Sequence, residues 1–358
     1  MVLETPEHQR YNTPSMTSDG AVDGRWIACD ESGYDGEQLL SPGRYMAVSA
    51  VAVDDVEAEG IVRSLRERAR IKPDAPELKF KLFKRQDRAD LLSELWLPGG
   101  VLHERCSVYL VDKRYGVMSK VVDLLLEEAA NEGGIDLYAD GQARRLAREL
   151  FLQGPRALGA VRYEALQRAF VGFARRKDPG DRPAAIRAFY ETLEDAWTAS
   201  TRRNVTEVLG MLRSTRHHAD EMHRIVEKNG PLELLITALA TLTRAWAQRL
   251  RPLHVLADEH NALTDDVFDS IRAVLRSGYG PTPSSMFQGV NVARIVRGSS
   301  IDHPSIQLAD LLAGAAGVVA EHSAGTTPSP FAEVVAPAIL PLIEGWSLVA
   351  AEPPLTMP

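Results

Sequence analysis

The sequence predicts an α/β fold in which a mixed sheet is flanked by helices and interrupted by a large helical insertion. Short apolar segments of strand character alternate with segments whose apolar residues recur every three or four positions. One long stretch, residues 141–250, is helical in pattern almost throughout. Composition agrees with this class, since 45% hydrophobic and 25% charged residues are ordinary for a globular chain of 358 residues.

Five segments are predicted as strands. Residues 25–30 (RWIACD) form a short apolar run, and residues 44–53 follow a Ser-Pro-Gly turn. Residues 105–112 (RCSVYLVD) are rich in β-branched and apolar side chains, which favours a strand. The same character returns at residues 253–258 (LHVLAD) and 291–297 (NVARIVR).

Helices are predicted between these strands from the spacing of their apolar residues. Pro304 suits the first turn of the last of them. Outside the insertion the predicted helices cover residues 55–70, 86–97, 117–131, 264–276 and 304–320. Inside it they cover 144–151, 162–176, 184–198, 203–212 and 232–250, with breaks expected at Pro155, Pro179-Gly180 and Asn229-Gly230-Pro231.

The predicted boundaries divide the chain into three parts. Residues 1–22 lack the basic and apolar segments of a secretory signal and are expected to be a disordered lead. Residues 23–322 form the α/β domain with its insertion, and residues 323–358 form a Pro-rich tail. No apolar run is long enough to span a membrane, and Cys29 and Cys106 are interpreted as buried free thiols. We therefore expect a cytoplasmic protein.

Charge is distributed unevenly along a chain whose formal net charge is −8. Residues 141–230 contain 17 Lys and Arg against 11 Asp and Glu, so a basic segment lies inside an acidic protein. Such a segment either contacts the phosphates of a nucleic acid or forms solvated helix faces. The insertion is also a candidate surface for a protein partner.

Two acidic residues fall at predicted strand ends, where the chemistry of α/β sheets tends to lie. Asp30 ends the first strand and begins Asp-Glu-Ser-Gly, a sequence that also suits a simple turn. Asp258 ends the fourth strand, where it is either a functional carboxylate or the cap of the next helix. Asp265 competes with it for that capping role.

Two more acidic residues lie outside strands. Glu77 belongs to the loop sequence Glu-Leu-Lys, where a solvated side chain is the simplest interpretation. Asp310 lies in a helix that is apolar on most faces, which predicts burial. Burying an isolated carboxylate costs on the order of several kcal/mol, so Asp310 requires either a metal ion or an arginine partner. Gln307 lies one turn earlier on the same helix face.

Carboxylates that are distant in sequence but gathered in space are what a divalent-metal site requires. Mg²⁺ and Mn²⁺ prefer hard oxygen ligands, and Mg²⁺ is usually held by a few carboxylates together with waters and substrate phosphates. The four acidic motifs therefore predict metal-assisted phosphodiester chemistry with Mg²⁺ or Mn²⁺ as the cofactor.

Other residues compete for places in this site. Asp112 and Asp140 each end an apolar run and could replace Glu77 or Asp258. Glu127 or Glu128, on the predicted helix 117–131, could supply the glutamate instead. A second acidic and histidine-rich group is interpreted as a polar helix surface rather than a zinc site; it comprises His217, His218, Asp220, Glu221 and His223. Covalent catalysis is poorly supported, because the sequence has no Gly-x-Ser-x-Gly motif.

The motifs together resemble those of the bacterial domain-of-unknown-function 3800 family. They are Asp30-Glu31-Ser32-Gly33, Glu77-Leu78-Lys79, Val111-Asp112-Lys113, Leu256-Ala257-Asp258-Glu259, Ser300 and the segment 306–314 (IQLADLLAG), in the family's order. That family is regarded as ribonuclease H-like, and its members are suspected metal-dependent nucleases, some of them linked to mobile elements or antiphage defence. The resemblance implies a ribonuclease H-like domain with the metal ligands Asp30, Glu77, Asp258 and Asp310.

Two departures from the family accompany this resemblance. The helical insertion is longer than the compact family pattern implies. A ribonuclease H arrangement also usually places its glutamate on the helix after the third strand, whereas Glu77 precedes that strand. Glu127 and Glu128 therefore stay open as alternatives to Glu77.

The expected mechanism is hydrolysis of DNA or RNA with two divalent ions roughly 3.5–4 Å apart. Asp30 would bridge both ions, Asp258 and Glu77 would complete one of them, and Asp310 the other. Lys79 and Lys113 are expected to bind phosphate or developing charge, and Gln307 to orient a carboxylate. The basic insertion would follow the nucleic-acid backbone. A non-catalytic module that binds nucleic acid or protein, and a nucleotide phosphohydrolase, are the alternative functions.

Overall fold

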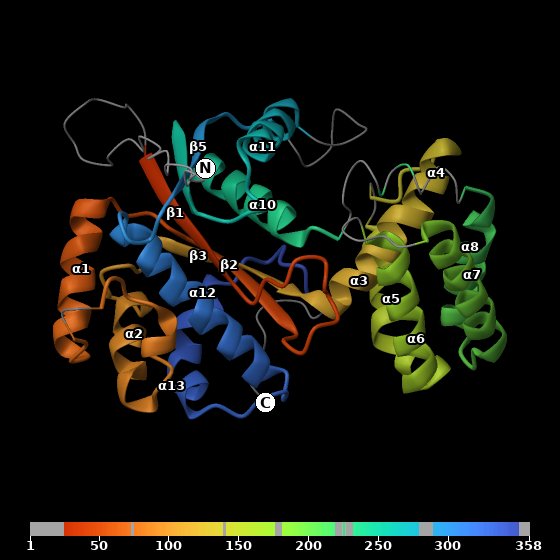
Figure 1. Cartoon of the computed structure of the whole chain (residues 1–358), viewed down its shortest axis with the longest axis horizontal. Helices are drawn as coiled ribbons and strands as arrows, with labels where there is room; N and C mark the ends of the chain where they lie inside the picture. Colours follow the sequence, from red (N-terminus) through yellow and green to blue (C-terminus); the bar gives the residue numbers. More distant parts are fainter. Residues whose placement is uncertain are drawn as a thin grey trace, which may run out of the picture.

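The structure is a computed structural model that describes residues 25–350 except 73–74, 139–140, 176–180, 219–223, 225, 227–231 and 279–288. The predicted disordered lead, residues 1–22, lies outside the described residues. The centre of the fold is a five-stranded mixed sheet in the order β3-β2-β1-β4-β5 (Figure 1). Its strands are β1 (Arg25–Ser32), β2 (Tyr45–Val51), β3 (Cys106–Asp112), β4 (Leu253–Asp258) and β5 (Val292–Gly298).

The sheet combines an antiparallel half with a parallel half. The strand β2 runs antiparallel to both β1 and β3, whereas β4 runs parallel to both β1 and β5. The central strand β1 therefore has one neighbour of each direction. All five strands predicted from the sequence are confirmed, and the chain is of the α/β class.

Helices cover both faces of this sheet (Figure 1). The apolar helix α12 (Pro304–Ser323) crosses one face along β1 and β2. The helices α1 (Asp55–Arg68) and α13 (Pro330–Ile339) pack against it, and α2 (Ala89–Trp96) packs against α13. The other face is covered by α10 (Leu234–Arg249) and α11 (Asp265–Ser277). Short turns of 3-10 helix lie at Phe80–Leu82, Gln86–Arg88, Thr215–His218 and Leu340–Leu342.

Alternation of side chains along the strands separates two cores. On β2, Met46 and Val48 belong to the core on the α10 face, whereas Ala47 and Val51 belong to the core on the α12 face. On β1 and β4, Ala28 and Leu256 pack with Ile306 of α12. Residues two positions further along these strands therefore also face α12.

A group of helices extends beyond the edge of the sheet. The helix α3 (Lys113–Val121) leaves β3 and continues through a π-helical stretch (Val122–Glu127) into α4 (Glu128–Glu132). Beside it pack α5 (Gln142–Leu158), α6 (Ala160–Ala174), α7 (Arg182–Ala199) and α8 (Arg203–Ser214), which we call the helical lobe (Figure 1). A cluster of aromatic rings, Phe170, Phe173 and Phe189, holds α6 against α7.

The break expected at Pro155 does not occur. This proline lies inside α5, whose end comes at Gly159, a residue with φ of +76°. The missing backbone donor of Pro155 falls in the last turn, so little of the helix depends on it. The other two expected breaks, at residues 179–180 and 229–231, lie outside the described residues.

Two segments pack against the sheet rather than apart from it. The helix α10 falls within the predicted insertion, but it lies on the sheet, where Trp246 Nε1 donates to Ser107 Oγ of β3 at 2.7 Å. Within the predicted tail, Ile343 and Leu348 form parallel bridges with β3. Residues 330–350 therefore complete the core beside this strand. Among the described helices, none has the length and apolar character needed to cross a membrane.

Candidate functional site

Asp30 and Asp258 lie on neighbouring parallel strands. The register pairs Cys29 of β1 with Ala257 of β4, so the next step along both strands sets Asp30 beside Asp258. Neighbouring strands are about 4.8 Å apart, and the two aspartates lie two positions after Ala28 and Leu256, which face α12. Asp30 is only 6% exposed. Two carboxylates from distant parts of the chain are thereby brought together on one face of the sheet.

Asp310 reaches the same place from α12. It lies one turn after Ile306, the residue that packs on β1 and β4. Its Oδ2 accepts a hydrogen bond from the backbone N–H of Phe80. Lys79, Glu77 and Glu31 are the charged residues that act on its carboxylate. No arginine pairs with Asp310 among the described residues; its carboxylate has a backbone donor and the nearby charge of Lys79 instead, and the metal alternative stays a prediction.

The three aspartates are held in surroundings that disfavour their charged forms. Burial raises the pKa of Asp30, and the charges of Glu31, Asp258 and Asp310 raise it further. Burial also raises the pKa of Asp258 and of Asp310, although the Lys79 ammonium opposes both shifts. Mutual repulsion and desolvation in one place are typical of sites whose carboxylates have a chemical task.

The segment from Glu77 to Phe80 is fastened to α12 on both sides of Lys79. The backbone N–H of Leu78 donates to Gln307 Oε1 at 2.9 Å, and the N–H of Phe80 donates to Asp310. Gln307 is buried, and its Nε2 donates to the carbonyl oxygen of Ser300 at 2.6 Å. Gln307 therefore holds two loops together through their backbones and does not bond a carboxylate directly.

Ser300 connects Glu77 with Lys79. Its hydroxyl donates to Glu77 Oε2 and accepts from Lys79 Nζ at 3.2 Å. Lys79 Nζ also lies 3.4 Å from Glu77 Oε2. Burial lowers the pKa of Lys79, but surrounding carboxylates outweigh this effect and raise it. Those carboxylates are Asp30, Asp310, Asp258 and Glu77, the four residues predicted as ligands.

The residues suit a hard divalent cation in their chemistry. All four candidates offer carboxylate oxygens, and a cation would relieve their mutual repulsion. In the part of the chain that the structure describes, no three Asp, Glu, His or Cys side chains converge into a ready metal-binding group. Of the four carboxylates, only Glu77 pairs with the Lys79 ammonium among the described residues, whereas the charges of Asp30, Asp258 and Asp310 act on it from beyond salt-bridge distance.

Lys113 and Asp112 do not join this cluster. The Lys113 ammonium is buried against the β1–β2 connection, where it donates to Gly33 O at 3.1 Å, to Ser41 Oγ at 2.9 Å and to Asp35. Asp112 caps α3 through the backbone N–H of Arg114 and Tyr115, and it pairs with Arg44 at 2.6 Å. Both residues fix local structure.

The glutamates left open by the sequence also separate from one another. Glu77 acts on Asp310 and Lys79, whereas the residues that act on Glu127 are Glu128, Asp123 and Asp136. Glu127 and Glu128 lie where α3 continues into α4, away from α12 (Figure 1). Of the three glutamates, Glu77 is the one beside the aspartates.

The remaining alternatives lie elsewhere or outside the described residues. In the histidine-rich segment, His218 Nδ1 lies 3.1 Å from Glu132 Oε2 of α4, and its ring contacts that of His217. This arrangement agrees with a polar helix surface. Asp140, Asp220, Glu221 and His223 lie outside the described residues.

Glu31 is the residue of this site that sequence reasoning missed. Its charge contributes to the raised pKa of Asp30, Asp258 and Asp310. Adjacent residues of a strand point to opposite faces, so an Asp-Glu pair gives no reason to expect both near one site. Only the position of Glu31 near the end of β1 brings it close.

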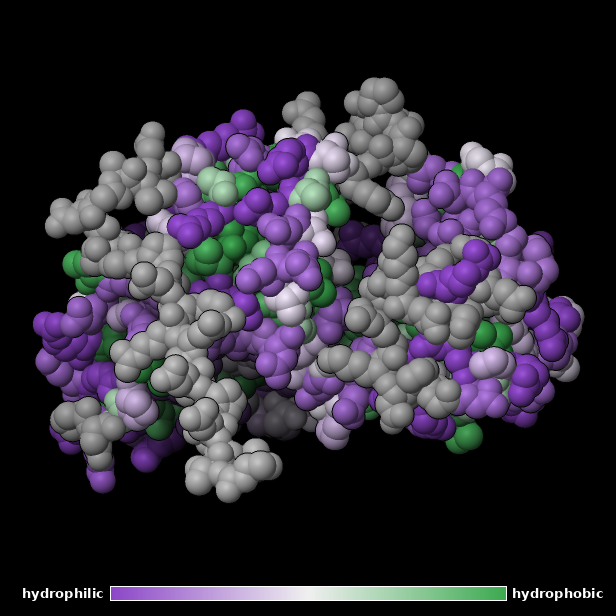
Figure 2. Space-filling view, turned by 45° about the horizontal axis from the view of Figure 1, so that its top comes forward, coloured by the Kyte–Doolittle hydropathy of each residue, from purple (hydrophilic) through white to green (hydrophobic). Residues whose placement is uncertain are grey.

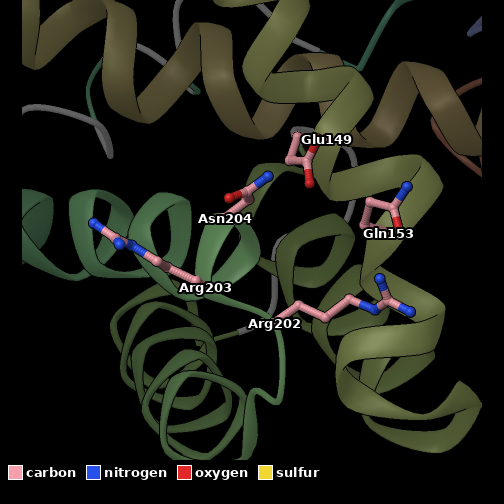
Figure 3. A pocket seen from close by; sticks show the side chains of 5 residues that line it. All are labelled: Glu149, Gln153, Arg202, Arg203 and Asn204. Atoms are coloured by element: carbon pink, nitrogen blue, oxygen red, sulfur yellow. The ribbon is translucent and has the colours of Figure 1, made fainter.

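A separate hollow lies in the helical lobe. Its volume is about 390 Å³, and it is lined by Glu149 and Gln153 of α5 and by Arg202, Arg203 and Asn204 at the start of α8. Figure 3 shows Glu149 and Asn204 directed toward the space between these helices, whereas Arg203 points away; Arg203 pairs with Glu207 at 2.7 Å. The visible surface of this lobe is mostly hydrophilic (Figure 2). None of the carboxylates around Lys79 lines this hollow.

Comparisons with protein-family models, with curated proteins and with solved structures gave no match.

Proposed function

We propose that this chain is a divalent-metal-dependent nuclease that hydrolyses phosphodiester bonds in DNA or RNA. The observation that carries the proposal is that three different elements bring Asp30, Asp258 and Asp310 close enough for their charges to affect one another and Lys79. Partly or fully buried carboxylates that repel one another cost stability, and proteins accept such costs mainly at functional sites.

Mg²⁺ or Mn²⁺ is the cofactor that this donor set favours, because every candidate ligand is a carboxylate oxygen. Asp30, Asp258 and Asp310 would hold the ion, and Glu77 would complete the set. When bound, the ion supplies positive charge that polarises the phosphodiester and stabilises the charge developing during hydrolysis.

The chain's own residues prepare this site. The N–H of Phe80 restricts the rotation of Asp310, and the hydroxyl of Ser300 holds Glu77. Gln307 fixes the loop that contains Glu77 and the loop that contains Ser300 to α12. Lys79 offers a positive charge beside the carboxylates, where a phosphate oxygen of the substrate would bind.

A ribonuclease H-like fold is the finer assignment that we propose for the α/β architecture. It is supported by an aspartate on the central strand of a five-stranded mixed sheet, a second on the adjacent parallel strand and a third on the helix that crosses them. The motif resemblance to the domain-of-unknown-function 3800 family supports the same assignment. The basic helical lobe is proposed to bind the nucleic-acid backbone.

The experiment is a cleavage screen of the purified protein against single- and double-stranded DNA and RNA with Mg²⁺ or Mn²⁺. Asp30→Asn and Asp310→Asn should each remove cleavage of any substrate that the wild type cuts. Asp90→Asn is the matched control, because Asp90 is exposed on α2. Full activity of either site variant would refute the proposal.

The same experiment separates the alternatives. Nucleic-acid binding without cleavage, and without a Mn²⁺-induced thermal shift that requires Asp30, would indicate a non-catalytic binding module. Hydrolysis of mononucleotides in place of polymers would indicate a nucleotide phosphohydrolase.

A further inference from the structure

Lys79 pairs with Glu77, and its charge also interacts with those of the other three predicted ligands. Its ammonium lies 3.4 Å from Glu77 Oε2, and the charges of Asp30, Asp258 and Asp310 also act on it. Its side chain is 27% exposed, so it is partly open to solvent. In the absence of a divalent ion, the positive charge of Lys79 offsets part of the repulsion among these carboxylates.

The side chain of Lys79 is free to move without its backbone. The backbone N–H groups of Leu78 and Phe80, on either side of it, are bonded to Gln307 and Asp310 of α12. The ammonium itself is held by Ser300 Oγ at 3.2 Å and by carboxylate charge. Rotation about the four side-chain torsions, χ1 to χ4, moves this group relative to a fixed backbone, so it can leave the carboxylates by rotation alone.

We propose that Lys79 is the resident counter-cation of the carboxylate site, and that a divalent cation binds by displacing its ammonium, which then becomes available to a phosphate group. This inference rests on the proposed function, since it assumes that the carboxylates take a divalent ion. It assigns Lys79 two successive partners, first the carboxylates and then the anionic substrate.

Removing Lys79 should change metal affinity in the direction opposite to that expected for a residue that assists metal binding. A lysine that only assists the metal site would weaken metal binding when it is removed. A lysine that competes with the metal would strengthen metal binding when it is removed, because the ion then meets four uncompensated carboxylates. Removal should also destabilise the metal-free protein, since the repulsion is no longer offset.

The experiment measures Mn²⁺ affinity by titration calorimetry at pH 7, together with thermal unfolding with and without Mn²⁺. The variants are Lys79→Gln, which removes the charge, and Lys79→Arg, which keeps it. The matched control is Lys81→Gln, because Lys81 is exposed two residues further along the same segment. Asp30→Asn reports whether the measured binding belongs to the carboxylate site.

Lys79→Gln should bind Mn²⁺ about tenfold more tightly than the wild type, unfold at a lower temperature without Mn²⁺ and gain more from its addition. Lys79→Arg and Lys81→Gln should keep the wild-type affinity within about twofold. Lys79→Gln could also fold only when Mn²⁺ is present. In that case, folding at Mn²⁺ concentrations below those at which the wild type binds the ion supports the inference. Failure to fold at saturating Mn²⁺ overturns it.

Two failures can be told apart. If the wild type does not bind Mn²⁺, or if Asp30→Asn binds it as tightly as the wild type does, the proposed metal site is overturned and this inference with it. Wild-type binding that requires Asp30, combined with equal or weaker binding by Lys79→Gln, would overturn only the role assigned to Lys79.

Discussion

The backbone N–H of Leu78 donates a hydrogen bond to the side chain of Gln307, which lies 229 residues later in the chain. The Nε2 of Gln307 donates in turn to the carbonyl oxygen of Ser300. One buried glutamine thus joins the loop of Glu77 and Lys79 to the connection between β5 and α12. The positions of Glu77 and Lys79 relative to Asp310 depend on this amide.

Gln307→Ala should lower the free energy of unfolding by about 1–3 kcal/mol, because the backbone groups of Leu78 and Ser300 lose a buried partner. The loosened loop should also bind Mn²⁺ less tightly. Urea denaturation and calorimetry measure the two effects, with the exposed Gln86→Ala as control. An unchanged unfolding free energy would show that the amide does not fasten the loops.

The raised pKa values of Asp30, Asp258 and Asp310 predict a pH dependence with a definite sign. In the native state these groups bind protons at higher pH than in the unfolded state, where an aspartate titrates at about 3.9. Their contribution to stability is therefore fully present below that pH and is lost as the pH rises through the raised native pKa.

Asp30→Asn should accordingly become more stable relative to the metal-free wild type as the pH rises from about 4 to 7. Comparing the two proteins cancels Asp35, Asp55 and Glu57, whose pKa values are lowered and which both proteins share. Saturating Mn²⁺ should reverse the order, since only the wild type binds it fully. A stability difference that does not vary with pH would contradict the proposed repulsion.

Lys113→Met should reduce stability without weakening the carboxylate site. Its ammonium donates to Gly33 O, Ser41 Oγ and Asp35, so its loss should cost about 1–3 kcal/mol in urea denaturation. Mn²⁺ affinity of the folded variant should stay within about twofold of wild type. A stable variant that has lost Mn²⁺ binding would instead show that Lys113 belongs to the carboxylate site, where the sequence predicted it to bind phosphate or developing charge.

The double variant Arg202→Gln, Arg203→Gln tests the helical lobe. If these residues at the start of α8 contact two phosphates, the slope of log affinity against log salt should fall by about 2 for duplex DNA. The control is Arg63→Gln with Arg68→Gln on α1, which removes equal charge from exposed ion pairs. Equal slopes in both double variants would remove the lobe from the proposed binding surface.

The elements themselves were largely predictable from the sequence, because each strand and most helices carry their own periodicity. What each element packs against was not. The helix α10 has the same pattern as its neighbours in the predicted insertion, yet its apolar face lies on β2 and β3. The helix α13 was not predicted at all, and Pro337 inside it disguises its pattern.

The candidate site shows the same division. The sequence could select Asp30 and Asp258 because strand ends are recognisable, and Asp310 because an acid on an apolar helix is anomalous. It could not show that Lys113 turns toward Asp35, that Glu31 lies near the aspartates, or that Lys79 pairs with Glu77. These facts depend on side-chain directions fixed only by tertiary packing.

The gathering of the aspartates into a cation site is tested most directly by anomalous diffraction from crystals of the full chain grown with Mn²⁺. We expect an anomalous difference peak coordinated by oxygens of Asp30, Asp258 and Asp310, with the Lys79 ammonium moved away from them. A well-occupied Mn²⁺ elsewhere, with no peak among these three carboxylates, would contradict the proposal.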